Sequence, residues 1–271
     1  MSDAETTFEV RDDGVAVFTL NRPDKMNAIS QRMFDEDLPA MVRRAERDDA
    51  IRALVIAGAG GNFCSGADVT RMQRKDGAPD PARNSNLRGL LQTVMYPLIN
   101  LPKPTIAAVD GIAFGGGFSL AMAADVMLAS DRARFSLVFG RIGLIPDMAI
   151  AYTLPRAIGA KRAKELAYTA RSFGAEEAER MGLISAICAP ETLVDEAIKM
   201  ASRMAKGSGD AQAVAKSLID RSLASSQADM IDAEAAAQQS VRQSEFHREA
   251  VRRFLAKEPR LYDWDQMARE G

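Results

Sequence analysis

The chain contains few of the residues that build metal sites and disulfide frameworks. Its 271 residues include one histidine, His247, and two cysteines, Cys64 and Cys188. One histidine and two distant cysteines do not form a ligand cluster at metal-binding spacing, and a disulfide framework needs more cysteines than two. We therefore expect neither a resident metal ion nor a disulfide scaffold.

An excess of charge of one sign is also missing, and so are long apolar runs. The 35 basic and 37 acidic side chains give a net charge of −2, which leaves no electrostatic footprint for nucleic acid. No segment is long and apolar enough to span a bilayer, and residues 1–7 lack the apolar core of a secretory signal. These absences favour a cytoplasmic protein that binds neither nucleic acid nor membrane.

The chain does have glycine where apolar strands end. The apolar run 105–109 leads into three glycines, 115–117, and an apolar helix follows them. The run 53–57 leads into a second glycine-rich turn, 58–66. Glycine lets the backbone come close to a ligand, and the first N–H groups of a helix have no partner within it. Such groups hold an anion, or a carbonyl oxygen that becomes anionic during a reaction; a turn that simply needs small residues is the alternative.

Hydrophobic periodicity predicts an α/β protein whose second half is helical. The Pro39 ring should kink the helix predicted over 33–47 or mark a boundary, and the polar residues 72–86 should form a mobile surface loop. The expected strands are 15–20, 53–57, 105–110, 126–129 and 183–187, and the expected helices are 33–47, 87–101, 117–124, 160–170, 175–181, 191–206, 210–225, 228–244 and 246–257.

Several segments in sequence order share one family pattern: 20–28, 53–68, 103–111, 115–117, 143–147, 173–178 and 181–184. Together they resemble the enoyl-CoA hydratase/isomerase family, the crotonases. The resemblance implies a crotonase-like spiral of strand-strand-helix units over residues 1–200. It also implies a helical C-terminal region, 201–271, for assembly into a homotrimer or hexamer and for covering coenzyme A.

The resemblance implies an oxyanion hole and a coenzyme A site. The backbone N–H groups of Ala67 and Gly116 would hold the oxygen of an acyl-CoA thioester as it becomes an enolate. No cofactor beyond the coenzyme A moiety of the substrate is implied. The expected contacts to coenzyme A are Lys25, Met26, Ala28, Ser65, Ala67, Asp68 and Val69, with Phe254 and Lys257 from a neighbouring subunit.

Both glutamates that hydratases of this family use are absent here. One belongs two positions after the third glycine, where this chain has Ser119, and the other four positions before Gly143, where it has Phe139. These residues do not replace paired carboxylates in the hydration of a double bond. Several isomerase branches carry a catalytic aspartate at the position of Asp147. A single carboxylate can remove a proton and return it to another carbon of the same enolate.

We therefore expect an enoyl-CoA isomerase in which Asp147 shuttles a proton. Met148 and its apolar neighbours should raise the pKa of the Asp147 carboxyl; a loop aspartate that caps a helix is the simpler role. Three alternatives stay open: a hydratase or an acyl-CoA hydrolase with displaced acid residues, or a catalytically silent acyl-CoA-binding protein. A serine-hydrolase pair of Ser119 and His247 is disfavoured because nothing in the sequence brings the two together.

Overall fold

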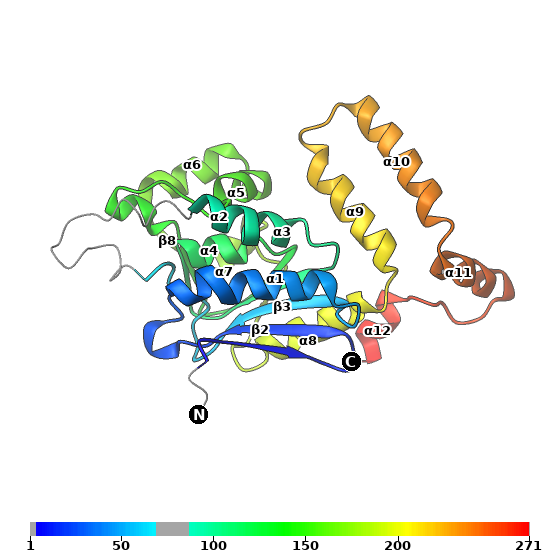
Figure 1. Cartoon of the computed structure of the whole chain (residues 1–271), viewed down its shortest axis with the longest axis horizontal. Coiled ribbons are helices and arrows are strands. Elements are labelled where there is room, and N and C mark those ends of the chain that lie inside the picture. The colour runs from blue at the N-terminus through cyan, green and yellow to red at the C-terminus, as the bar shows by residue number, and fades with distance from the viewer. Residues whose placement is uncertain (1–3, 69–86, 271) are drawn as a thin grey trace.

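The structure is a computed structural model that describes residues 4–68 and 87–270. Residue 69 and the predicted mobile loop, 72–86, lie outside this part of the chain. The described residues form an α/β core with two sheets, from which C-terminal helices project (Figure 1). This confirms the predicted fold class.

The larger sheet has six strands in the order β1-β2-β3-β4-β6-β9. All neighbouring pairs are parallel except β1 and β2, which form an antiparallel hairpin. The strand bounds are β1 Thr6–Val10, β2 Val15–Leu20, β3 Ala53–Gly58, β4 Thr105–Val109, β6 Val126–Ser130 and β9 Ala186–Cys188.

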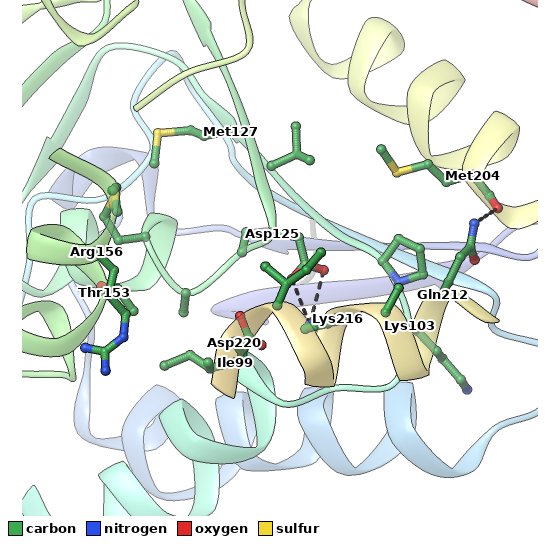
Figure 2. A pocket seen from close by; sticks show the side chains of 18 of the residues that line it. Ile99, Lys103, Asp125, Met127, Thr153, Arg156, Met204, Gln212, Lys216 and Asp220 are labelled. Atoms are coloured by element: carbon green, nitrogen blue, oxygen red, sulfur yellow. Dashed lines mark hydrogen bonds and ion pairs between the residues drawn. The ribbon is translucent and has the colours of Figure 1, made fainter. Parts of the chain in front are cut away.

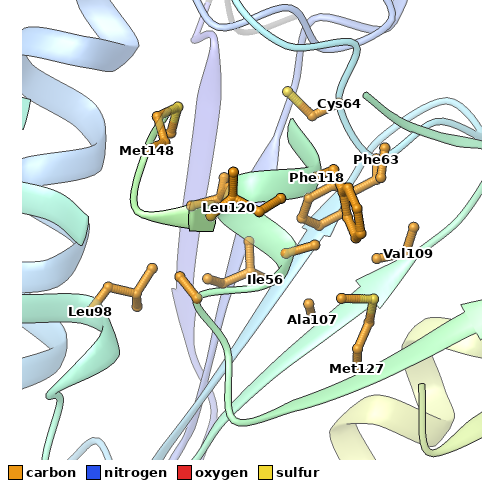
Figure 3. Packing of buried hydrophobic residues seen from close by; sticks show 14 of the residues in the cluster. Ile56, Phe63, Cys64, Leu98, Ala107, Val109, Phe118, Leu120, Met127 and Met148 are labelled. Atoms are coloured by element: carbon orange, nitrogen blue, oxygen red, sulfur yellow. The ribbon is translucent and has the colours of Figure 1, made fainter. Parts of the chain in front are cut away.

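Helices cover both faces of this sheet, as continuous apolar strands require. In β3, Val55 faces α8 (Leu193–Ala205) together with Ala201, whereas Ile56 faces the opposite layer. That layer contains α1 (Leu38–Arg47), the helical run α2 (Leu87–Leu90), η5 (Leu91–Met95) and α3 (Tyr96–Ile99), and α4 (Gly116–Ala121). Figure 3 shows the buried side chains around α4.

The smaller sheet carries the turn that leads to the candidate site. Its strands β5 (Ile112–Phe114), β7 (Arg134–Ser136) and β8 (Ser172–Gly174) lie in the order β5-β7-β8. β4 and β5 precede α4, and each of the two strands joins a different sheet, as a strand-strand-helix unit predicts. Phe118 of α4 packs on Phe135 and Phe173, with ring centroids 5.4 and 5.9 Å away. The aromatic cluster fixes α4 against this sheet.

Several short elements were not predicted from the sequence. Three-residue strands such as β5, β7 and β8 offer too few residues for a periodic signal. The five residues of the edge strand β1 alternate between partly buried and exposed and contain no continuous apolar run. The strand expected at 183–187 is β9, Ala186–Cys188, and the helix expected at 33–47 begins as a π-helical turn, η2 (Met33–Asp37). Pro39 lies in the first turn of α1 and marks the boundary. Other bounds are η1 Pro23–Lys25, η6 Val138–Ile142, α5 Ile150–Ile158, α6 Ala160–Thr169 and α7 Ala175–Arg180.

The C-terminal helices extend from the core. α9 (Gly209–Ser222), α10 (Gln227–Val241) and α11 (Glu245–Ala256) project to one side, and α12 (Trp264–Glu270) returns towards the sheet (Figure 1). The expected division at residue 200 falls inside α8, whose last turn still packs on the sheet through Ala201 and Ala205. No helix within the described residues has the length and apolar character to cross a membrane.

Candidate functional site

The two glycine-rich turns lie against each other. Cys64 accepts a hydrogen bond from Phe114 N at 2.9 Å and donates one to Ile112 O at 2.9 Å, so segment 63–64 runs along β5. A Cβ on Gly117 would lie 2.2 Å from Cys64 O, and a Cβ on Gly66 would lie 2.9 Å from Phe114 O. The absence of side chains at these two glycines therefore permits the contact.

This contact brings two unpaired backbone donors together. Ile29 N donates to Gly66 O at 2.8 Å and Asp68 N donates to Ile29 O at 3.1 Å, so the intervening Ala67 N–H faces away from Ile29. Gly116 N is at the start of α4, where a helix offers no acceptor. Within the part of the chain that the structure describes, neither N–H donates to a protein group. A Cβ on Gly116 would lie 3.9 Å from Ala67 N. The two residues that carry the donors are therefore close neighbours.

Asp147 lies on the loop between η6 and α5 and is half-buried. Burial raises the pKa of its carboxyl to about 6, against a smaller opposing effect of its own backbone N–H. A carboxyl with this pKa accepts a proton near neutral pH and returns it at little cost. Its side chain has the property required of an acid–base group.

The backbone after Asp147 is in the left-handed region. Met148 has a φ of 53° and Ala149 a φ of 63°, and this conformation costs a non-glycine residue roughly 1–2 kcal/mol. Met148 is buried, and its Sδ would be 2.8 Å from a Cβ on Gly116. The Met148 thioether therefore occupies the space that the missing Gly116 side chain leaves.

Ser119 and Phe139 lie next to this loop and turn, where neither supplies a carboxylate. The buried Ser119 hydroxyl has two acceptors in reach, Asp147 O at 2.9 Å and Gly115 O at 3.2 Å. The Phe139 ring lies 3.8 Å from where a Cβ on Gly115 would be. The site thus contains a carboxyl at Asp147 and none at the two expected hydratase positions.

Three other reactive side chains are poor candidates for acid–base or nucleophilic chemistry at the turns. Asp110 accepts two hydrogen bonds from Arg132, at 2.8 and 2.6 Å. Burial raises the pKa of Asp110, but these bonds and the guanidinium charge outweigh it, so the carboxyl stays ionised. Burial raises the pKa of the Cys64 thiol to about 12. His247 lies in α11, at the other side of the molecule from α4 and Ser119 (Figure 1).

The segment expected to contact coenzyme A is held against the glycine-rich turn 58–66. Ser65 N donates to Met26 O at 2.9 Å. The fully buried Asn27 side chain donates to Asn62 O at 2.6 Å and to Ala59 O at 2.9 Å. Asn27 is not among the residues predicted from the sequence to contact coenzyme A. Its left-handed φ of 54°, which asparagine tolerates well, is the property that suits it to this turn.

The structure places the remaining expected contacts in different surroundings. Lys25 and Met26 expose their side chains beside Ser65, and Ala28 is buried. The Asp68 carboxylate pairs with Arg22 at 3.4 Å, so it faces the protein. Val69 lies outside the described residues. Phe254 and the helix-terminal Lys257 are exposed on α11, remote from the site of their own chain.

A separate cavity of about 770 Å³ lies between the core and the C-terminal helices (Figure 2). Lys216 of α9 crosses it to Asp125, with Nζ 2.9 Å from Oδ1 and 3.1 Å from Oδ2. Asp147, Ala67 and Gly116 do not line it. The cavity and the candidate site are different places.

Comparison with known proteins identifies the class to which this fold and site belong. Residues 10–267 match the sequence profile of the enoyl-CoA hydratase/isomerase family. The structure superposes on an enoyl-CoA hydratase/isomerase of Cupriavidus metallidurans with a TM-score of 0.88 and 35% identity, covering 97% of each chain. The chain belongs to the enoyl-CoA hydratase/isomerase family, which confirms the predicted crotonase fold.

The names of similar proteins include both activities. A 1,2-epoxyphenylacetyl-CoA isomerase of Escherichia coli is 34% identical over 90% of this chain and 93% of its own length. A protein of Rhodobacter capsulatus named as a probable enoyl-CoA hydratase is 39% identical over 96% of this chain and 98% of its own length. Family membership therefore fixes acyl-CoA processing, while the choice of reaction depends on the site.

Proposed function

We propose that this protein is an enoyl-CoA isomerase that moves a double bond through a thioester enolate, with Asp147 as the proton shuttle. The half-buried Asp147 carboxyl carries the proposal, because its raised pKa, about 6, suits it to both halves of a proton transfer. Ser119 and Phe139 offer no second carboxyl to activate water. A shift of a double bond needs one such group.

In the proposed reaction, the Asp147 carboxylate removes a proton from the carbon between the thioester carbonyl and the double bond. The released electron pair forms a dienolate, whose oxygen accepts hydrogen bonds from the Ala67 and Gly116 N–H groups. The protonated carboxyl then delivers its proton to the far carbon of the former double bond. No atom is gained or lost. Each backbone donor contributes on the order of 2.7–4 kcal/mol to the stability of such an oxyanion.

Product analysis with a panel of enoyl-CoA esters distinguishes the possible reactions. We expect the double bond to migrate without the addition of water. Addition of water to the double bond would assign the protein as a hydratase, and release of free coenzyme A would assign it as a hydrolase. Tight binding of the esters without any product would instead support the silent acyl-CoA-binding alternative.

The coenzyme A site is part of the same proposal, and it needs a second copy of the chain. Exposed Phe254 and Lys257 would cover the nucleotide bound to a neighbouring subunit. No cofactor beyond the coenzyme A moiety is required, and a cytoplasmic location remains the expectation. The remaining proposed contacts are Lys25, Met26, Ala28, Ser65, Ala67, Asp68 and Val69 of the subunit that holds the ester.

Exposed apolar side chains on the projecting helices support the proposed self-association into a trimer or hexamer. Ile219 of α9 and Leu223, directly after α9, are each 70% exposed, and Phe254 and Leu255 of α11 are each 76% exposed. Side chains of this kind are commonly buried by a partner. Sedimentation analysis should give the mass of three or six chains, and Phe254→Ala should weaken binding of a coenzyme A ester. A monomer that binds the ester with unchanged affinity would contradict this part of the proposal.

A further inference from the structure

The hydroxyl of Ser119 joins two elements of the candidate site. Ser119 is 1% exposed and lies in α4, three residues after Gly116. Its Oγ is 2.9 Å from the backbone carbonyl of Asp147 and 3.2 Å from that of Gly115. A hydroxyl donates one proton at a time, and the shorter contact is the one with Asp147. Ser119 thus links the loop of the acid–base residue to the helix of an oxyanion donor.

The Asp147 carbonyl has another donor, but that donor comes from its own segment. Ile150 N lies 3.3 Å away, in the first turn of α5. This bond closes the turn locally and does not fix the turn relative to α4. The Ser119 hydroxyl does fix it, because it reaches Asp147 from a separate element.

The loop needs such an attachment because its backbone is unfavourable. Met148 and Ala149 follow Asp147 with φ values of 53° and 63°. Non-glycine residues keep this conformation only when the surrounding structure holds them there. The buried Met148 side chain beside Gly116 provides one such restraint on the far side of Asp147. The Ser119 hydroxyl provides the other, at the Asp147 carbonyl itself.

We propose that Ser119 is a positioning residue that holds the Asp147 carboxyl at a fixed place relative to the Gly116 N–H. This inference rests on the proposed function, in which Asp147 moves the proton. It assigns Ser119 no step of its own: among the described residues, the recorded acceptors of its hydroxyl are two backbone carbonyls, and no base contacts its oxygen. Displacement of a catalytic group by about 1 Å costs up to about a hundredfold in rate.

The first test removes the hydroxyl in Ser119→Ala and keeps it in Ser119→Thr. We expect Ser119→Ala to lower kcat tenfold to a hundredfold, with KM changed less than threefold. The acidic midpoint of its pH–kcat profile should move to lower pH, because a released carboxyl is more hydrated. Ser119→Thr should recover most of kcat. If threonine does not fit, Ser119→Cys replaces it as the test, because cysteine fits the same space with a weaker donor. The kcat of Ser119→Cys should lie between those of Ser119→Ala and the parent protein.

Ser136→Ala is the matched control. Ser136 is fully buried, and its hydroxyl donates to Ala170 O at 3.0 Å, so the variant loses a bond of the same kind that does not involve Asp147. The Ser136 carbonyl accepts from Gly115 N at 2.9 Å, and this backbone bond is kept in the variant. Both alanine variants should lose similar thermal stability, while Ser136→Ala keeps kcat. Equal kcat in the two variants, or a Ser119→Ala midpoint that does not move, would overturn the positioning role.

A double-variant cycle and a crystal structure separate this inference from the proposed function. Ser119→Ala should lower the rate no further once Asp147→Asn is present, whereas a twofold independent loss or more would contradict action through Asp147. A crystal structure of Ser119→Ala should show the Asp147 backbone displaced or in alternative conformations; an unmoved loop would refute the inference. Full activity of Asp147→Asn alone would refute the proposed function. The crystal structure of Ser119→Ala would then still show whether the Ser119 hydroxyl holds the Asp147 loop in place.

Discussion

The raised pKa of Asp147 implies that this carboxylate reduces the stability of the fold at neutral pH. The pKa rises from 3.8 to about 6 on folding, because burial disfavours the charged form. Between these values the folded chain binds more protons than the unfolded chain, so stability falls as pH rises through this window. Replacing Asp147 by the neutral, similarly shaped asparagine should remove that effect.

The size of the gain follows from the shift. About two pKa units correspond to roughly 3 kcal/mol at 1.36 kcal/mol per unit. Solvent reaches the half-buried side chain and screens it, which reduces the expected gain of Asp147→Asn to about 1–2 kcal/mol at pH 7.5. For a chain of this length, that corresponds to an increase in Tm of about 2–6 °C.

Thermal and urea denaturation between pH 4 and pH 8 measure this gain. The difference between Asp147→Asn and the parent protein should be small near pH 4, grow up to about pH 6 and stay constant above pH 7. Asp12→Asn, a change of an exposed aspartate in the turn before β2, is the control and should show no such trend. A destabilised Asp147→Asn protein, or a difference independent of pH, would refute the reasoning.

Three further predictions concern the turns around the site. Gly117→Ala should destabilise the fold by several kcal/mol or prevent folding, because its Cβ would lie 2.2 Å from a backbone oxygen. Gly182→Ala is the control in the same denaturation experiments: its Cβ meets nothing within 4 Å, so it should cost only about 1 kcal/mol of backbone strain. Asn27→Ala should cost about 2–4 kcal/mol, because buried backbone acceptors lose their donors, and calorimetry should show weaker binding of a coenzyme A ester. A thiol reagent should label Cys188 in the native protein and Cys64 only after unfolding, since Cys64 is buried with a pKa of about 12; rapid native labelling of Cys64 would contradict the packing.

The sequence predicts the long elements of this fold well because their patterns extend over many residues. β3 and β4 are continuous apolar runs, and both form strands where the sequence predicts them, in a sheet covered on two faces. The glycines of the two turns also permit a close approach of one backbone segment to another, as at Gly117 and Cys64, which fits the simpler alternative of turns that need small residues; the approach to a ligand stays a prediction. The strands β5, β7 and β8 escape prediction because three residues carry no measurable period.

The candidate site was only partly readable in the sequence. The proposed role of Ala67 and Gly116 uses backbone groups, so the two residues were identified from the family resemblance alone, and their proximity is known only from the fold. The bond from Ser119 to the Asp147 carbonyl joins residues 28 positions apart, and no sequence pattern records it. The same holds for the left-handed φ of Met148, since its side chain gives no sign of that conformation.

The central claim is that Asp147 moves a proton within an acyl-CoA substrate, and exchange with deuterated water tests it most directly. The parent protein is incubated with a 3-enoyl-CoA ester in deuterated water. It should form the 2-enoyl ester and introduce deuterium at the carbon that loses the proton or at the carbon that receives it. Asp147→Asn should bind the ester with similar affinity, but its rates of double-bond migration and of deuterium exchange should both fall at least a hundredfold. Migration and exchange at the parent rate in Asp147→Asn would contradict the claim.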